Sequence, residues 1–188
     1  MKWLRKSPSE PLVVSMSGVK LGERVLVLGT SDHILLAGAG TRSGLTGRTC
    51  VVGESEPATT AAVAAAEEAG ALVEGFPAQW SALPFDDGSF DVVLVRQILP
   101  VLAVTARSGC VAEIRRVLRP GGRVVVIDNL GGGLLGGLLG GSRPDATRFY
   151  EQEGGPVSLL EAHGFKAVRP LAEREGLIFT EGARPARV

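Results

Sequence analysis

The sequence predicts an α/β fold: a doubly wound, mostly parallel sheet that carries helices on both faces and ends in a C-terminal antiparallel hairpin. Three observations support this prediction. Short apolar segments alternate with helical segments, the first two apolar segments end in glycine, and the last two follow one another without a helix between them. Such alternation is typical of βαβ units, whose parallel strands are buried on both faces.

The first strand is predicted at residues 24–29, a short apolar run that ends in Gly29. The helix after it begins at Ser31 or Asp32, because either side chain can cap a helix, and it covers residues 34–37. Right-handed crossovers between parallel strands place ligands at the carboxyl ends of those strands. The turn after Gly29 is therefore the first candidate for a binding loop.

The second strand is predicted at residues 48–53, and the segment 56–70 after it is a clear helix. Pro57 lies near the start of this helix and Gly70 lies just past its end, which is the usual asymmetry of helix termini. A third strand follows at residues 71–76. These elements complete the first half of the predicted sheet.

A fourth strand at residues 90–95, a helix within 108–122 and a fifth strand at 123–128 continue the pattern. Pro120 and Gly121 are expected to end the helix. The apolar face of this helix comprises Val111, Ile114, Val117 and Leu118. Its last turn is basic, which the helix dipole favours, and contains Arg115, Arg116 and Arg119.

The pattern changes after residue 128. Residues 131–141 are almost entirely glycine and leucine, and a last helix is predicted at 155–163. Residues 165–182 then form two strands with a turn at 172–175, which predicts a hairpin at one edge of the sheet. The Gly/Leu-rich segment is either a loosely ordered linker, which we favour, or an apolar loop that contacts a lipid-like acceptor or a membrane surface.

Composition limits the classes of function. With 188 residues, we expect an N-terminal arm or short helix at 1–18 and one domain at 19–188. The net charge of zero gives no general attraction to nucleic acid. No signal-peptide core or bilayer-spanning run is evident, and Cys50 and Cys110 suit buried thiols better than a disulfide or a metal site. These features predict a cytoplasmic protein without a metal.

Two motifs carry a resemblance to a known family. "LPFDDGSFDVVLV" at residues 83–95, followed by "EIRRVLRPGGRVVVID" at 113–128, resembles the class I S-adenosylmethionine-dependent methyltransferases. The nearest branch contains the ubiquinone and menaquinone biosynthesis methyltransferases, and the resemblance covers roughly residues 19–182. It implies a Rossmann-like methyltransferase fold, S-adenosylmethionine as cofactor, and methyl transfer to a small-molecule acceptor.

The first cofactor motif is degenerate by comparison with the family. Family members end the first strand with an acidic residue and then have three glycines at alternate positions. Here these positions hold Val27, Gly29, Ser31 and His33, so the carboxylate and two glycines are missing. We expect His33 to be a partly exposed residue in the first helical turn rather than a pocket residue.

Other residues match family positions around the cofactor. Glu54, after the second strand, fits the carboxylate that binds the ribose diol. Gln79 fits the adenine contact through its amide oxygen, and Trp80 either flanks the adenine or belongs to the core. The resemblance thus predicts a cofactor-binding set of Gly29, Thr30, Ser31, Glu54, Ser55, Gln79, Trp80 and Arg96.

The predicted substrate-binding residues are Gln97, Asp128 and Tyr150. Gln97 and Asp128 follow or end strands at the same edge, and Tyr150 lies in a segment that often covers the substrate in the family. No catalytic residue is assigned, because methyl transfer requires chiefly the alignment of donor and acceptor. For Asp128, a role as a turn residue is an equal alternative.

Two other functions are known for folds of this kind. A dinucleotide dehydrogenase requires G-x-G-x-x-G after the first strand, and "GTSDHI" lacks it. A non-catalytic binding or scaffold protein with the methyltransferase fold is the main alternative, motivated by the degenerate first motif. The segment before the first strand is short. The cofactor site is therefore either open or completed by the second subunit of a homodimer.

Overall fold

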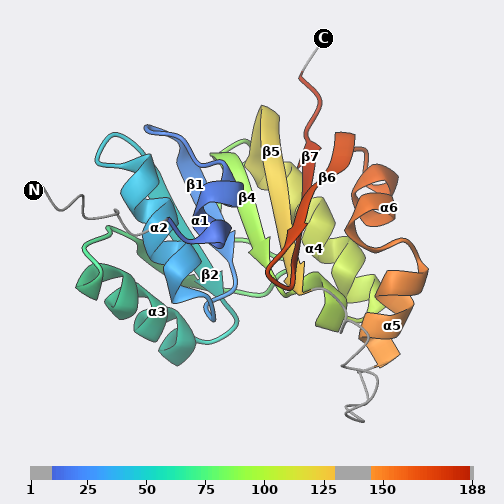
Figure 1. Cartoon of the computed structure of the whole chain (residues 1–188), viewed down its shortest axis with the longest axis horizontal. Coiled ribbons are helices and arrows are strands. Elements are labelled where there is room, and N and C mark those ends of the chain that lie inside the picture. Colours follow the sequence, from blue (N-terminus) through green and yellow to red (C-terminus); the bar gives the residue numbers. More distant parts are fainter. Residues whose placement is uncertain (1–9, 130–144, 187–188) are drawn as a thin grey trace, which may run out of the picture.

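The computed structural model describes residues 10–129 and 145–186, which form a seven-stranded sheet with helices on both faces (Figure 1). The Gly/Leu-rich segment at 131–141 lies outside the described residues, as do residues 1–9. The elements are α1 (Leu12–Ser17), β1 (Arg24–Leu28), α2 (His33–Ser43), β2 (Arg48–Gly53), α3 (Glu56–Glu68), β3 (Glu74–Pro77), β4 (Phe90–Arg96), the 3-10 turn η1 (Leu99–Val101), α4 (Val104–Val117), β5 (Leu118–Asn129), α5 (Asp145–Gln152), α6 (Gly155–Ala162), β6 (Lys166–Arg174) and β7 (Leu177–Ala183).

The strand order is β3-β2-β1-β4-β5-β7-β6. The first five of these strands are parallel, whereas β7 is antiparallel to both β5 and β6. The chain reverses direction across the sheet between β1 and β4, which is the topological switch point where α/β folds bind ligands. The predicted fold class, including its C-terminal hairpin, is confirmed.

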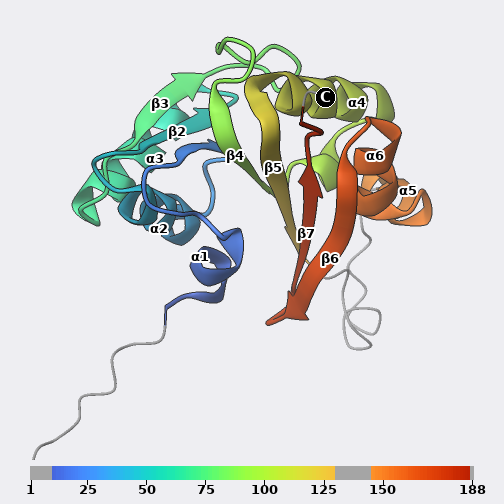
Figure 2. The same cartoon turned by 90° about the horizontal axis from the view of Figure 1, so that it is seen from above.

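Alternate residues of the central strands bury their side chains on opposite faces of the sheet. Val25 and Val27 pack towards α1, α2 and α3, while Leu26 and Leu28 pack towards α4 and α6. Figure 2 shows these two groups of helices on either side of the sheet. Because both faces are covered, the central strands are apolar throughout, as the sequence pattern indicated.

Several boundaries differ from the prediction. Helix α2 starts at His33 with Asp32 as its cap and extends to Ser43, well beyond the predicted 34–37. Strand β3 starts three residues later than predicted, at Glu74. Helix α5, not predicted from the sequence, has only eight residues and follows the Gly/Leu-rich segment.

Helix α4 ends at Val117, earlier than the prediction that Pro120 and Gly121 would end it. Strand pairing explains the difference, because Leu118 already pairs with Phe90 of β4. Arg119 therefore belongs to β5 rather than to the last helical turn, and it forms an ion pair with Asp91.

The hairpin turn is at Glu175 and Gly176, so the predicted turn at residues 172–175 begins three residues too early and ends one residue too early. Arg174 pairs with Leu177, so the loop has two residues. Both have positive φ, at 52° and 77°, which suits the right-handed twist of the flanking strands. The glycine at the second loop position is the sequence signal that marks this turn.

The two family motifs are held together by polar contacts. Glu113 Oε2 accepts a hydrogen bond from the backbone N–H of Leu83 at 2.8 Å. Arg116 donates to the carbonyl oxygens of Leu83 and Phe85, at 3.1 and 2.7 Å, and forms an ion pair with Glu113. These contacts give a physical reason for the joint occurrence of the motifs, since the helix residues fix the loop at 83–89.

The turn after β1 requires glycine. Gly29 has a φ of +105°, and a Cβ at this position would lie 3.0 Å from the carbonyl oxygen of Arg96. Its N–H also donates to the carbonyl oxygen of Val52 at 3.0 Å. The backbones after β1, β2 and β4 thus approach closely at Gly29, and a side chain would push them apart.

We expect Gly29→Ala to lower the free energy of unfolding by about 2–4 kcal/mol, because backbone strain and contact with Arg96 add together. Gly70→Ala is the matched control: Gly70 also has positive φ, but a Cβ there meets nothing within 4 Å. The control should cost only about 1 kcal/mol. Urea denaturation of both variants measures their free energies of unfolding. An equal loss in the two variants would contradict the importance of the close contact between Gly29 and Arg96.

Candidate functional site

The carboxyl ends of β1, β2, β4 and β5 lie side by side at one edge of the sheet (Figure 1). Leu28 is in register with Val52 and Val95, and Arg96 is in register with Ile127. The residues that follow these positions are therefore neighbours across the edge. This edge brings the predicted cofactor residues and the predicted substrate residues into one region.

An ion pair spans the switch point between β1 and β4. Arg96 Nε donates to Asp32 Oδ2 at 2.9 Å, and the side chains of both residues are largely buried. Asp32 Oδ1 accepts from the N–H of Leu35 at 2.9 Å, so the same carboxylate also caps α2. The binding loop at residues 29–32 is thereby fixed to β4, a contact that the sequence pattern did not predict.

The other predicted cofactor residues lie along the rim of the sheet. Thr30 is half-buried, while Ser31, Glu54 and Gln79 are exposed and accessible to a ligand. Ser55 caps α3 by accepting a hydrogen bond from the N–H of Ala58 at 3.4 Å. None of the predicted cofactor residues lines the large cavity described below.

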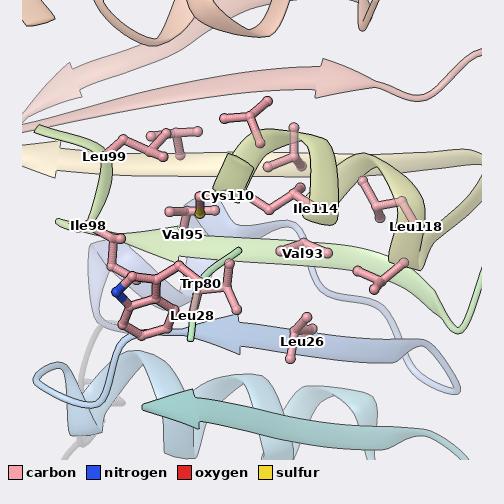
Figure 3. Close-up of a cluster of buried hydrophobic side chains, with 14 of the residues drawn as sticks. Leu26, Leu28, Trp80, Val93, Val95, Ile98, Leu99, Cys110, Ile114 and Leu118 are labelled. Carbon is pink, nitrogen blue, oxygen red and sulfur yellow. The ribbon is translucent and has the colours of Figure 1, made fainter. Parts of the chain in front are cut away.

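Trp80 and His33 were the two ambiguous residues near the cofactor loop. Trp80 is 9% exposed, and Figure 3 shows it among Leu28, Val95 and Ile98 of the buried cluster. His33 is exposed as the first residue of α2, as expected. Trp80 therefore has a structural role in the core; its contact with adenine stays a prediction.

The rim residues fit the chemistry of an adenosyl sulfonium in part. Gly29 packs closely against Arg96 with no room for a Cβ, and the exposed Glu54 offers a carboxylate suited to a ribose diol. Val27 is buried on the face of α1–α3 and supplies no carboxylate for the cofactor's ammonium group. The residues present would hold the adenosine end through Glu54 and Gln79.

A cavity of about 600 Å³ adjoins this rim on the side of β5 and α5; we name it the β5–α5 cavity. All three predicted substrate residues line it, so the structure brings them together. Its lining comprises Gln97, Pro100, Val101, Asp128, Asn129, Thr147, Tyr150, Glu151, Gly154, Gly155, Pro156, Val157, Pro170, Glu173, Ile178 and Thr180. A volume of this size is typical of sites for small organic ligands.

A buried hydrogen bond connects two of these residues. The Tyr150 hydroxyl donates to Asp128 Oδ2 at 3.1 Å, and Asp128 and Tyr150 are only 6% and 3% exposed. Asp128 Oδ1 is buried and has no hydrogen-bond partner among the described residues. A buried carboxylate oxygen without a donor is costly, and such groups are frequent at functional sites.

Burial raises the pKa of Asp128 from 3.8 to about 6, against the opposing effects of the Tyr150 hydrogen bond and the positive charge of Arg96. Burial and the neighbouring Asp128 carboxylate also raise the pKa of Tyr150, which keeps its phenol protonated. Tyr150 is therefore the donor in this pair. Asp128 is poised to exchange a proton near neutral pH.

Two features of this region were not found from the sequence. Arg107 is buried beneath the Tyr150 ring, 4.7 Å from its centroid, and donates at 2.9 Å to the carbonyl oxygens of both Leu99 and Leu102. Gln97 has a φ of +57°, a strained conformation for a residue with a side chain. Arg107 precedes Cys110 by three residues on the apolar face of α4, and that spacing was the available signal.

Among residues 10–129 and 145–186, no group of His, Cys, Asp and Glu side chains could hold a metal ion, and no helix is long and apolar enough to cross a membrane. Cys50 and Cys110 are free thiols, and burial raises the pKa of each to about 12. The interpretation of both cysteines as buried thiols is confirmed.

Comparison with known proteins gives a family and a fold. Residues 36–126 match the family model described as "Methyltransferase domain". An uncharacterized protein of Mycobacterium tuberculosis is 30% identical over 140 residues, which are 73% of this chain and 48% of that protein. The chain thus spans about half the length of this curated relative.

Two solved structures share the fold. A SAM dependent methyltransferase from Aquifex aeolicus matches with a TM-score of 0.73 and 20% identity, over 91% of this chain and 87% of that chain. The [4+2]-cyclase SpnF matches with a TM-score of 0.66 and 17% identity, over 94% and 79%. Because one of these similar structures is that of a cyclase, the fold alone does not specify methyl transfer.

Residues 36–126 thus match a methyltransferase domain, and the chain shares its fold with a SAM dependent methyltransferase. The resemblance seen in the two motifs is confirmed at the level of the methyltransferase domain and its fold. Its assignment to the ubiquinone and menaquinone branch is untested and stays a prediction.

We expect Asp128→Asn to remove a pH-dependent destabilisation. The pKa of Asp128 is higher in the folded protein, so the folded state binds more protons between pH 4 and 6, and stability falls as pH rises through this window. A shift of about two pKa units corresponds to about 3 kcal/mol. The variant should therefore gain stability relative to wild type as pH rises from 4 to 7.

Urea denaturation at several pH values measures this difference directly. Glu161→Gln, on the exposed side of α6, is the control and should follow the pH dependence of the wild type. A stability difference between Asp128→Asn and wild type that stays constant from pH 4 to 7 would show that Asp128 ionises normally.

Proposed function

We propose that the chain transfers a methyl group from S-adenosylmethionine to a small, apolar acceptor that binds in the β5–α5 cavity. One observation carries this proposal: Gln97, which lines the cavity together with Asp128, directly follows Arg96, the β4 residue that packs against Gly29. The N–H of Gln97 donates to the carbonyl oxygen of Ile127 at 3.1 Å, so these two strand ends are in contact. A cofactor bound at the rim beside Gly29 and an acceptor bound in the β5–α5 cavity would therefore be neighbours.

The cofactor, when bound, supplies an electrophilic methyl group on a sulfonium. The chain's own residues then have two tasks. Glu54 and Gln79 hold the adenosine end at the rim, while the prolines and aliphatic side chains of the cavity exclude water and orient the acceptor. Alignment of two reactants in this way removes much of the barrier to an in-line displacement.

A non-catalytic binding protein is the second candidate. Val27, Ser31 and His33 stand where the family has a carboxylate and two glycines, and none of the predicted cofactor residues lines the β5–α5 cavity. On this hypothesis the cavity binds a small molecule or a partner segment without cofactor. Cofactor binding separates the two hypotheses.

We expect S-adenosylhomocysteine, the demethylated cofactor, to bind the purified protein in isothermal titration calorimetry. Glu54→Gln should weaken this binding at least about tenfold, because a charged acceptor of two hydrogen bonds becomes a neutral one. Glu56→Gln is the matched control, since Glu56 is an exposed acidic side chain in the first turn of α3. The control should change the affinity less than about threefold.

An absence of heat and of thermal stabilisation at millimolar S-adenosylhomocysteine would favour the non-catalytic alternative. Equal weakening by Glu54→Gln and Glu56→Gln would instead show that the cofactor binds but that Glu54 has no specific role.

A further inference from the structure

We infer that the β5–α5 cavity takes an apolar alcohol or phenol, and that Asp128 accepts the proton of the reacting hydroxyl group. This inference rests on the proposed methyl transfer and names both the acceptor class and the catalytic base for it. It draws on two properties of the cavity: the charge of its lining and its unpartnered carboxylate oxygen.

The charge of the cavity excludes anionic acceptors. Its described lining contains three carboxylates, those of Asp128, Glu151 and Glu173, and no lysine, arginine or histidine. A phosphate or carboxylate in this cavity would find no cationic side chain in the described lining to compensate for its lost hydration. Pro100, Val157 and Ile178 instead offer apolar surface, which favours a neutral aromatic or aliphatic body.

The unpartnered oxygen requires a hydrogen-bond donor. Tyr150 satisfies Asp128 Oδ2, whereas Oδ1 is buried and lacks a partner among the described residues. An ionised carboxylate only accepts hydrogen bonds, so the group that completes this site must carry a hydrogen. A carbon or thioether nucleophile would leave Oδ1 unsatisfied.

A hydroxyl meets this requirement and can still react. Its hydrogen can point to Asp128 while its oxygen keeps lone pairs for attack. A protonated amine held by the same carboxylate has no lone pair, because the proton that makes the ion pair occupies it. We therefore assign a hydroxyl rather than an ammonium group to the reacting end of the acceptor.

The transfer step balances with Asp128 as base. The acceptor oxygen forms a bond to the methyl carbon, the carbon–sulfur bond breaks with its electron pair going to sulfur, and the hydroxyl proton passes to the Asp128 carboxylate. The protonated carboxyl then loses its proton to solvent. No oxidant, reductant or metal enters the balance.

Tyr150 is a positioning residue for Asp128. Its hydroxyl fixes Oδ2, and its ring rests on Arg107, which donates to the carbonyl oxygens of Leu99, at the start of η1, and Leu102, just after its end. Thr147 adds a second link from α5 to η1 by donating to the carbonyl oxygen of Pro100 at 3.2 Å. The carboxylate is thus held by elements on two sides.

The groups around Asp128 set the pH range of the base. Arg96 from β4 and Tyr150 from α5 favour its charged form, whereas burial favours its neutral form and dominates. Glu173 from β6 and Glu151 from α5 line the same cavity, and Arg107 from α4 contacts Tyr150. From β7, the register partner is Ile178, which does not titrate. The base is active above about pH 6.

The test is a binding experiment with 1-naphthol, its methyl ether 1-methoxynaphthalene, and the anion 1-naphthoate, with dissociation constants measured by calorimetry. At pH 8 the wild-type protein should bind 1-naphthol at least about tenfold tighter than either other probe, because only the hydroxyl can donate to the charged carboxylate. This preference should appear as pH rises through about 6.

Three variants locate the effect. Asp128→Asn should abolish the preference for 1-naphthol over its methyl ether, and Tyr150→Phe should move the onset of this preference to higher pH, because Asp128 then loses a donor that favours its charged form. Glu161→Gln, exposed on α6 and away from the cavity, should change neither. Thermal unfolding of each variant shows whether it is folded; a variant that unfolds is replaced by comparing the three probes on wild type alone.

Equal binding of 1-naphthol and its methyl ether, a preference that survives in Asp128→Asn, or no binding of any probe would overturn the inference. The proposed function fails separately, because it predicts binding of S-adenosylhomocysteine, which Asp128→Asn should retain. A protein that binds S-adenosylhomocysteine but does not distinguish the probes would keep methyl transfer and lose the alcohol or phenol acceptor.

Discussion

The close approach of three strand ends at Gly29 is the constraint on which the site depends. With a φ of +105° and no room for a Cβ beside Arg96, this residue lets β1 and β4 meet at the switch point. The Asp32–Arg96 ion pair then ties the following loop to β4. Both contacts are present although two glycines and the acidic residue of the family motif are absent. The degenerate motif thus retains Gly29, the one position where the backbone geometry requires glycine.

The two halves of the candidate site differ in physical character. The rim around Glu54 and Gln79 is exposed and polar, which suits a ligand rich in hydroxyls and amines. The β5–α5 cavity is apolar with a single buried acid–phenol pair, Asp128 and Tyr150, at its base. Ion pairs elsewhere, such as Arg116 with Glu113, hold loops in place rather than shape the cavity. A polar rim and an apolar cavity side by side suit a reaction between a polar cofactor and an apolar acceptor.

The order of strands and helices could be predicted from the sequence because apolar runs buried on both faces are distinctive. Boundaries set by tertiary contacts could not: α4 ends at Val117 because Leu118 pairs with Phe90, which no local signal reveals. Gln97 and Asp128 could be predicted as substrate residues because strand ends are recognisable, and Tyr150 was predicted from the family resemblance; all three line one cavity. The support beneath them, Arg107, was missed since an arginine on an apolar helix face is ordinarily taken for a solvated side chain. Homodimer formation and cytoplasmic location stay predictions.

Strand β7 lies between β5 and β6 although it follows both in the chain. During synthesis, β5 therefore has one bare edge until residue 183 has left the ribosome, and the wall of the cavity formed by Ile178 and Thr180 is absent until the same moment. A nascent chain at that stage presents unpaired backbone groups to other chains. Completion of the cavity and protection of the sheet from aggregation are thus a single late event in the biogenesis of this protein.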